Sequence, residues 1–260
     1  MANNISDLVF GFHAVESLLI EGRVQVLRLY VLDSRKDKRL EQILELAQQQ
    51  EISVDYRNRK GLDRLVHAIK GAVHQGIIAE TESVQLADEK ELEFRWVSMG
   101  EHPLFLILDG VMDPRNLGAC LRSAEAAGVD AVLLPKRRCA PITAVTRKTA
   151  SGAAESLFLV SVTNLARRMR WLSDQGVQIV GTSGESVGGA VAQAWSNPDY
   201  TQATAVVLGS EGSGMRALTH KHCDQVVALP MLGKVESLNV SVATGILLYE
   251  AIRQRSFSAL

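Results

Sequence analysis

The hydrophobic pattern divides the chain into two patterned regions. In the second region, six short apolar runs without polar alternation recur, and each is followed by a stretch with helical spacing. Such runs are typical of parallel strands that helices cover on both faces. The expected strands are residues 104–111, 131–135, 158–162, 177–183, 204–210 and 225–231. The expected helices are residues 117–128, 142–157, 164–176, 190–195, 215–222 and 240–255. The pattern therefore predicts an α/β domain with a parallel sheet over residues 102–260.

The first region, residues 1–80, predicts a smaller α/β domain. Its expected strands are residues 26–34, 52–56 and 76–80, and its expected helices are residues 13–19, 38–50 and 61–69. An acidic stretch without clear periodicity, residues 81–101, separates the two regions. Because such a stretch is typical of an exposed connection, we expect it to be a linker.

Composition narrows the class of protein. The 260 residues are 47% hydrophobic and 22% charged with a net charge of −1, which excludes attachment to nucleic acid by bulk charge alone. Aromatic residues make up 5%, which argues against rows of base-stacking rings. Three cysteines without a CxxC pair suit neither a disulfide framework nor a zinc site, so we expect no metal. Neither a signal-peptide pattern nor an apolar run of ~20 residues is present, so we expect a cytoplasmic protein.

Candidate chemistry gathers in three loops that follow expected strands. A parallel sheet places its ligand site at the carboxyl ends of its strands, so loops there are where a reaction is expected. In the first loop Asp113 and Pro114 form a turn, Asn116 is expected to cap the next helix, and Arg122 lies six residues further on. The alternative interpretation is an ordinary capped turn with a surface arginine.

The second and third loops carry glycines and small polar residues. The second contains Gly209, Gly212 and Gly214 in the order GxxGxG, so the dinucleotide fingerprint GxGxxG is not met. Glu211 lies in its middle, where a carboxylate would repel phosphate. In the third loop Ser237 and Asn239 precede a helix that is rich in small residues. The alternatives are a flexible glycine turn and an ordinary buried helix.

Together the three loops resemble the three signature motifs of the SpoU/TrmH branch of the SPOUT RNA methyltransferases. The motifs here are DPRNLGACLRSA, GSEGSGM and SLNVSVATG, in the family's order and spacing. The N-terminal FGFHAVESLL and VHQGIIAE resemble the L30e-type substrate-binding domain that precedes many members. The resemblance covers nearly the whole chain. It is strongest to bacterial members that methylate the ribose 2′-OH of a guanosine in the peptidyl-transferase-site loop of 23S rRNA.

The resemblance implies a fold, a cofactor and a set of site residues. The C-terminal domain is expected to contain a deep trefoil knot, and the protein is expected to be a homodimer in which the partner completes the active site. S-adenosylmethionine is the implied cofactor, held mostly by backbone groups. By motif position, the cofactor-binding residues are Thr182, Gly209, Leu229, Ser237 and Leu238. The implied catalytic residues are Arg122, Asn116, Glu211, Ser237 and Asn239, with Arg122 the main one.

The chemistry of methyl transfer to a ribose hydroxyl agrees with this assignment. The protein has to position a weak acid and stabilise the alkoxide charge that develops on it. An arginine fork can clamp a neighbouring phosphate and orient the hydroxyl, but a guanidinium stays protonated and is a poor general base. We therefore expect Arg122 to orient and to stabilise charge, and Glu211 to fix Arg122 or its loop.

RNA binding requires cations near the site. The segment 136–148 contains five basic residues and no acid, and these are the candidate RNA-binding residues: Lys136, Arg137, Arg138, Arg147 and Lys148. Further candidates are the run at 167–170 and, in the first region, Arg57, Arg59, Lys60 and Arg64. The alternative interpretation of all these residues is a solvated surface.

Other functions stay open from the residues alone. A nicotinamide-dependent oxidoreductase would use a similar sheet, but the missing GxGxxG argues against it. A non-catalytic RNA-binding or ribosome-assembly protein could keep the fold, although it would not need Asn116, Arg122, Glu211 and Asn239 together. Within the enzyme interpretation, tRNA or another rRNA is the alternative substrate, and the N-terminal domain favours 23S rRNA.

Overall fold

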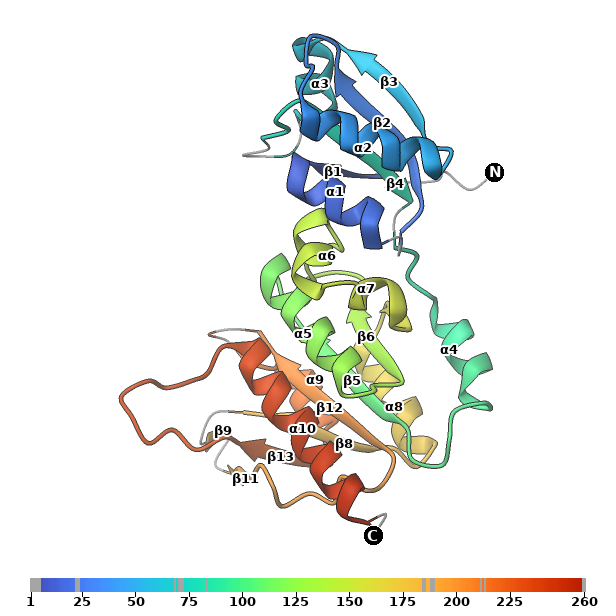
Figure 1. The fold of residues 1–260 in the computed structure, drawn as a ribbon. Coiled ribbons are helices and arrows are strands. Elements are labelled where there is room, and N and C mark those ends of the chain that lie inside the picture. The colour runs from blue at the N-terminus through green and yellow to red at the C-terminus, as the bar shows by residue number, and fades with distance from the viewer. Residues whose placement is uncertain are drawn as a thin grey trace. The chain divides into compact units, whose positions relative to one another are not determined.

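The computed structural model describes residues 6–21, 24–67, 69, 73–82, 84–183, 186–187, 190–210, 212 and 214–258. The chain divides into two compact units, Met1–Val84 and Gln85–Leu260. Figure 1 colours both units by residue number, from blue at the N-terminus to red at the C-terminus. Both units are mixed α/β, and the second holds a parallel sheet, so the fold class predicted from the sequence is confirmed.

The first unit is a four-stranded sheet with three helices. Its strands are β1 (Ser6–Phe10), β2 (Val26–Leu32), β3 (Ser53–Arg57) and β4 (Ile77–Glu82), in the order β1-β4-β2-β3. Its helices are α1 (Phe12–Glu21), α2 (Lys38–Gln49) and α3 (Arg59–Val66). Buried Leu62 and Val66 of α3 pack with Tyr30 and Ile78 of the sheet. Strand β1 was not predicted, because two polar residues followed by three apolar ones do not give the alternation of a strand.

The second unit is built on a seven-stranded sheet in the order β11-β13-β8-β12-β5-β6-β7, and its strand pairs are parallel. The strands are β5 (Leu104–Asp109), β6 (Ala131–Pro135), β7 (Leu159–Val162), β8 (Gln178–Thr182), β11 (Gln193–Ala194), β12 (Thr204–Gly209) and β13 (Gln225–Ala228). All residues of β5, β6 and β12 are buried, which explains why these strands read as continuous apolar runs.

Helices cover both faces of this sheet (Figure 1). The helices are α4 (Glu89–Trp96), α5 (Pro114–Ala126), α6 (Ala144–Ala150), α7 (Ala153–Ser156), α8 (Leu165–Asp174), α9 (Ala217–Lys221) and α10 (Val240–Ser258). On one face, Leu92 of α4 and Met169 of α8 pack with Phe105 and Ile107 of β5 in a single buried cluster. Helix α10 contacts α5 and strand β12.

Three local expectations are corrected by the structure. Residues 81–101 are not a plain linker, because they contain helix α4, whose Leu92 is fully buried in the core of the second unit. Residues 190–195 form two short strands, β10 (Ala190–Val191) and β11, instead of a helix. The helix expected over residues 142–157 is broken into α6 and α7, because Ser151 and Gly152 both adopt positive φ.

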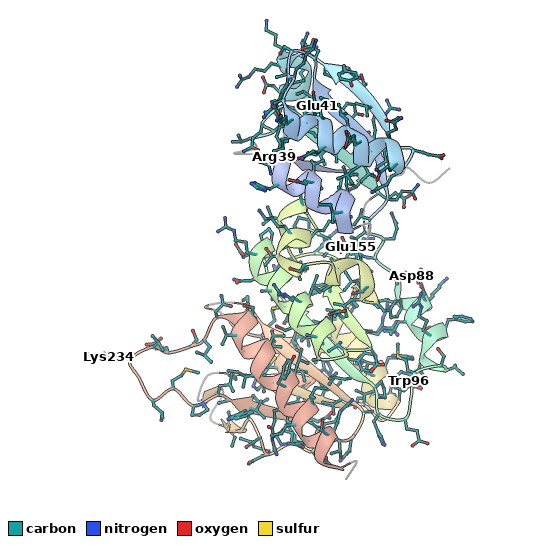
Figure 2. The ribbon with its side chains drawn as sticks, in the orientation of Figure 1. Arg39, Glu41, Asp88, Trp96, Glu155 and Lys234 are labelled. Carbon is teal, nitrogen blue, oxygen red and sulfur yellow. The ribbon has the colours of Figure 1, made fainter. Side chains whose placement is uncertain are left out.

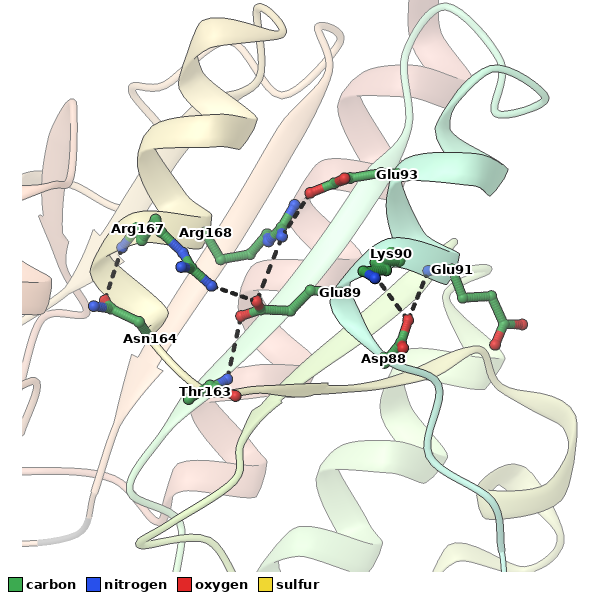
Figure 3. Close-up of polar contacts among 9 residues, drawn as sticks. All are labelled: Asp88, Glu89, Lys90, Glu91, Glu93, Thr163, Asn164, Arg167 and Arg168. Atoms are coloured by element: carbon green, nitrogen blue, oxygen red, sulfur yellow. Dashed lines mark hydrogen bonds and ion pairs between the residues drawn. The ribbon is translucent and has the colours of Figure 1, made fainter.

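Helix α4 is attached to α8 by a network of charged side chains (Figure 3). One Glu89 oxygen accepts a hydrogen bond from the Thr163 backbone N–H at 3.2 Å, and the other accepts from Arg167 at 2.7 Å. The neighbouring Arg168 is buried and pairs with Glu93 at 2.8 Å. A shielded carboxylate therefore holds the start of α4 against the loop before α8.

Replacing Glu89 by alanine is expected to lower the free energy of unfolding of the second unit by about 2 kcal/mol, since two hydrogen bonds to a shielded carboxylate are lost together with its 3.7 Å ion pair to the buried Arg168. Urea denaturation followed by circular dichroism measures the change. Glu91→Ala is the matched control, because Glu91 pairs with Arg95 on the exposed side of the same helix and such pairs contribute little. Equal losses in the two variants would contradict the role given to Glu89.

Among the helices of the described part of the chain, none is long and apolar enough to cross a membrane.

Candidate active site

The carboxyl ends of the central strands form one edge of the parallel sheet. Gly209 at the end of β12 lies in register with Asp109 at the end of β5. On the other side of β12, Thr182 ends strand β8 and donates a hydrogen bond from Oγ1 to the Val207 carbonyl at 3.2 Å. Leu229 directly follows β13, which pairs with β8. The topology therefore brings Thr182, Gly209 and Leu229 to the ends of three adjacent strands.

The first loop leads into α5, and its cap differs from the expectation. Asp113, not Asn116, is the N-cap: its carboxylate accepts from the backbone N–H groups of Arg115 at 2.8 Å and Asn116 at 2.9 Å. Pro114 follows at the first helical position, which its fixed φ favours. Asn116 lies within the first turn, and its side chain is therefore available for other contacts.

The first and third loops meet through two asparagines. The Asn239 amide donates from Nδ2 to Oδ1 of Asn116 at 3.0 Å, across 123 positions of sequence. The Oδ1 atom of Asn239 accepts a hydrogen bond from the Ser241 backbone N–H at 2.9 Å and thereby caps α10. One side chain thus fixes the start of α10 and ties it to the start of α5.

Arg122 lies further along α5 and is exposed. Its guanidinium donates to Oγ of Ser151, the residue directly after α6, at 3.3 Å. The structure therefore places Asn116 and Asn239 together and sets Arg122 apart from them, near the end of α6.

The second loop is a tight glycine turn folded back on β12. Ser210 and Gly214 exchange two backbone hydrogen bonds of 3.0 Å, and Gly214 adopts a φ of +64°. A Cβ on Gly209 would fall well inside contact distance of the backbone of Gly214 and Met215. Only glycine fits at the end of β12, because the turn packs directly on it. Glu211, the carboxylate predicted in this loop, lies outside the described residues.

The third loop connects β13 with α10 and extends away from the sheet, with Lys234 at its outer part (Figure 2). Leu229 at its start and Leu238 at its end are half-buried, whereas Ser237 is exposed. The leucines that the motifs assign to the cofactor therefore lie where the loop leaves and rejoins the domain.

A hollow of about 520 Å³ opens where the first two loops meet. Its wall comes from the first loop, from Ser210 and Arg216 beside the second loop, from Arg138 after β6, and from Val240 at the start of α10. Asn116 lines it, whereas Arg122 is not among its lining residues. Its volume lies in the range of small-molecule binding sites.

An ion pair beneath this hollow was missed in the sequence. The Asp109 side chain is fully buried, and its Oδ1 accepts from Nε of Arg216 at 2.6 Å. Its Oδ2 accepts from the backbone N–H of Arg216 at 3.1 Å. The pair fastens the segment after the glycine turn to the end of β5. An acidic residue closing a fully apolar strand was the available signal, but the sequence does not show its partner.

Replacing Arg216 by alanine is expected to lower the free energy of unfolding by about 3 kcal/mol, since it leaves the buried Asp109 carboxylate without its charge partner. Replacing both residues together, as Asp109→Asn with Arg216→Ala, is expected to recover part of that loss because the uncompensated charge disappears. Urea denaturation of both variants measures the difference. A double variant less stable than Arg216→Ala would contradict this account.

The predicted RNA-binding cations fall into two groups. Lys136, Arg137, Arg138 and Lys148 are exposed. Arg147 departs from the expectation of an exposed RNA-binding cation. It is buried and donates to Glu155 (labelled in Figure 2) at 2.7 Å, so it joins α6 to α7. In the run at 167–170, Arg168 is likewise buried. A charge run in sequence does not show which of its members have found an internal partner.

The described residues contain no group of three or more His, Cys, Asp or Glu side chains placed to hold a metal ion. The cysteines are free thiols, and burial raises the pKa of Cys139 to about 11 and that of Cys223 to about 12. Both thiols therefore stay protonated at neutral pH, and neither is a candidate nucleophile.

Two family models match the chain. The model of the SpoU rRNA Methylase family matches residues 103–249. A model described as RNA 2′-O ribose methyltransferase substrate binding matches residues 8–87. Together they cover both units and all three loops of the site.

Similar proteins span the chain from end to end. It is 48% identical over 250 residues to the 23S rRNA (guanosine-2′-O-)-methyltransferase RlmB of Photobacterium profundum, covering 96% of this chain and 98% of that protein. The protein of the same name from Escherichia coli strain K12 is 46% identical, with coverage of 97% and 100%. Among solved structures, the SpoU methyltransferase AviRb from Streptomyces viridochromogenes in complex with AdoMet is 24% identical with a TM-score of 0.70, covering 97% of this chain and 91% of that one. At this level of identity, the similarity to the solved structure shows a shared fold.

Proposed function

Because the chain belongs to the SpoU rRNA methylase family, we propose that it transfers a methyl group from S-adenosylmethionine to the ribose 2′-OH of a specific guanosine in 23S rRNA. The observation that carries this proposal is the near-complete coverage of relatives that bear this activity in their names. The meeting of the three motif loops at one edge of the sheet supports it. A ribosomal RNA substrate would also place the protein in the cytoplasm.

The described residues fit this cofactor. At the end of β12, Gly209 lies against the backbone of Gly214 and Met215, so backbone groups are close together there. Thr182, Gly209, Leu229, Ser237 and Leu238 are the residues proposed to hold the cofactor. Leu229 and Leu238 offer half-buried apolar surface for its nonpolar parts. When bound, S-adenosylmethionine supplies a methyl group that its sulfonium activates.

The polar residues of the site are proposed to handle the ribose. Asn116 and Asn239 hold the first and third loops in one geometry through their hydrogen bond. Arg122 is proposed to clamp a phosphate beside the target ribose with its guanidinium fork and to stabilise the alkoxide charge. Glu211 and Ser237 are proposed to support the loops that carry these groups. The hydroxyl proton is proposed to leave through phosphate or water, since a guanidinium stays protonated.

The exposed cations are proposed to bind the RNA backbone. Lys136, Arg137 and Lys148 are exposed and are proposed to contact phosphates, a contact that does not depend on the RNA sequence. Selection of one guanosine is then proposed to depend on RNA shape and on the N-terminal unit, whose family model is described as substrate binding.

A homodimer is proposed as the working form. Arg122 is exposed and does not line the hollow of its own chain, which fits a site that a second copy completes. On α10, Val242 is 50% and Tyr249 54% exposed, so the helix presents apolar side chains to solvent as well as to the core. Light scattering after size-exclusion chromatography is expected to give twice the chain mass of 28.3 kDa. A single-chain mass at micromolar concentration would contradict the dimer.

Methyl transfer from labelled S-adenosylmethionine tests the proposed function. Unmodified 23S rRNA and unmodified tRNA are supplied side by side, and label is expected in 23S rRNA only. Label in tRNA only would keep the reaction and overturn the substrate. Cofactor and RNA binding without any transfer would favour the non-catalytic assembly protein.

A further inference from the structure

Among the described residues that line the hollow beside the first loop, one positive side chain has no partner within the described part of the chain. Among its lining residues, Asp109 is neutralised by Arg216, and Asp113 is engaged as the cap of α5. Within the part of the chain that the structure describes, the Arg138 guanidinium has neither a hydrogen bond nor an ion pair. The N–H groups of the Arg138 guanidinium are therefore available as hydrogen-bond donors to a ligand in the hollow.

We propose that this hollow binds the guanine base of the target nucleotide, with Arg138 donating to its O6 and N7 atoms. The proposal rests on the proposed function and adds to it a specificity-determining residue. An arginine fork matches the two neighbouring acceptors of guanine, whereas adenine presents an acceptor beside a donor at the same edge. Arg138 would thereby select guanine.

The other lining residues suit a nucleobase better than a phosphate alone. Val111, Met112 and Val240 give the hollow apolar surface on which the faces of a ring can lie. A volume of about 520 Å³ exceeds what one phosphate group requires. Enzymes that act on a base hold it in such a pocket, with ring contacts on its faces and hydrogen bonds at its edge, and the same contacts would hold a base whose ribose is the target.

The backbone holds Arg138 at this wall in a conformation that costs energy. Its φ is +61°, in the left-handed region that L-residues other than glycine rarely adopt. The segment is fixed on both sides, because the Lys136 N–H donates to the Val162 carbonyl and the Ala140 N–H donates to the Val111 carbonyl, each at 2.8 Å. Strain of this kind tends to occur at ligand sites.

The hollow also adjoins the residues proposed for the reaction. Asn116 lines it and bonds to Asn239 at 3.0 Å, so a base in the hollow would lie beside the two asparagines that join the motif loops. By holding the base in the hollow, Arg138 can therefore select guanine and also position the attached ribose.

The test combines the variant Arg138→Ala with an RNA whose target base lacks the N7 atom. The substrate is 23S rRNA ligated from transcripts and a synthetic segment that carries either guanosine or 7-deazaguanosine at the target position. The second base lacks the N7 acceptor. With guanosine, Arg138→Ala is expected to lower kcat/KM roughly 10- to 100-fold. Replacing guanosine by 7-deazaguanosine is expected to reduce kcat/KM of the unchanged protein, and to have little further effect on Arg138→Ala.

Controls separate this contact from others. Arg137→Ala removes a neighbouring exposed cation that does not line the hollow, and it is expected to act equally on both RNAs and to lower the salt dependence of binding. Arg138→Lys keeps the positive charge but lacks the two-pronged guanidinium, and it is expected to lose most of the preference for guanosine over 7-deazaguanosine. Arg138→Gly relieves the positive φ, so it is expected to keep the melting temperature while losing the discrimination.

An equal loss for Arg138→Ala on both RNAs would overturn the base contact in favour of a phosphate contact. A matching loss of affinity for S-adenosylhomocysteine in Arg138→Ala would also overturn it, because the hollow would then belong to the cofactor. Absence of transfer by the unchanged protein to guanosine RNA would instead contradict the proposed function, so the two failures are distinguishable.

Discussion

Replacing Arg122 by alanine is expected to lower kcat for methyl transfer about 10²- to 10³-fold, as removal of one donor to a developing oxyanion does in other enzymes. Lysine at this position is expected to recover little, because an ammonium does not present the planar fork that clamps a phosphate. The unfolding free energy is expected to change by less than about 0.5 kcal/mol, since Arg122 is exposed and its hydrogen bond to Ser151 is long, at 3.3 Å. Single-turnover transfer at saturating RNA and cofactor measures the step.

Lys221→Ala removes an exposed cation elsewhere in the same unit and controls for a general effect of charge on RNA binding. It is expected to leave kcat unchanged. Near-normal turnover by Arg122→Lys would show that the bidentate role is wrong, and a charge at that position would then be sufficient.

Gly209→Ala is expected to remove measurable cofactor binding and to lower the unfolding free energy by about 3 kcal/mol. The added methyl group meets backbone, not the end of a flexible side chain, so the backbone of Gly214 and Met215 has to move. That movement pulls on Arg216, whose backbone and side chain are both bonded to Asp109. Calorimetry with S-adenosylhomocysteine and urea denaturation measure the two effects.

Gly100→Ala is the matched control, because a Cβ at Gly100 meets nothing within 4 Å. Its unfolding free energy and cofactor affinity are expected to stay within error of the unchanged protein. Normal cofactor affinity in Gly209→Ala would contradict the proposal that this turn holds the cofactor.

Sequence patterns predicted the elements whose burial is uniform. Strands β5, β6 and β12 are buried along their whole length, so their apolar runs identify them without any knowledge of the fold. The same patterns failed where structure depends on distant partners. Residues 190–195 have helical composition, yet Gln193–Ala194 pair with β13 at the edge of the sheet. Tertiary pairing there overrides a local preference.

The candidate site divides in the same way. Its loops were predictable, because parallel strands end at one edge and the motifs follow those ends. The joining contacts were not, because Asn116 and Asn239 are 123 positions apart and Asp109 and Arg216 are 107 apart. Burial of Arg147 was equally hidden, since its partner Glu155 lies beyond the break between α6 and α7. Spacing predicts the residues of a site, and packing determines which of them remain available.

The most direct measurement is the chemical identity of the product nucleoside. Unmodified 23S rRNA is treated with the protein and S-adenosylmethionine, digested to nucleosides and analysed by mass spectrometry, with Arg122→Ala treated in parallel. We expect one 2′-O-methylguanosine per RNA, whose 3′ linkage resists alkali, and almost none with Arg122→Ala. A base-methylated guanosine, or a methyl group on another nucleotide, would contradict this expectation.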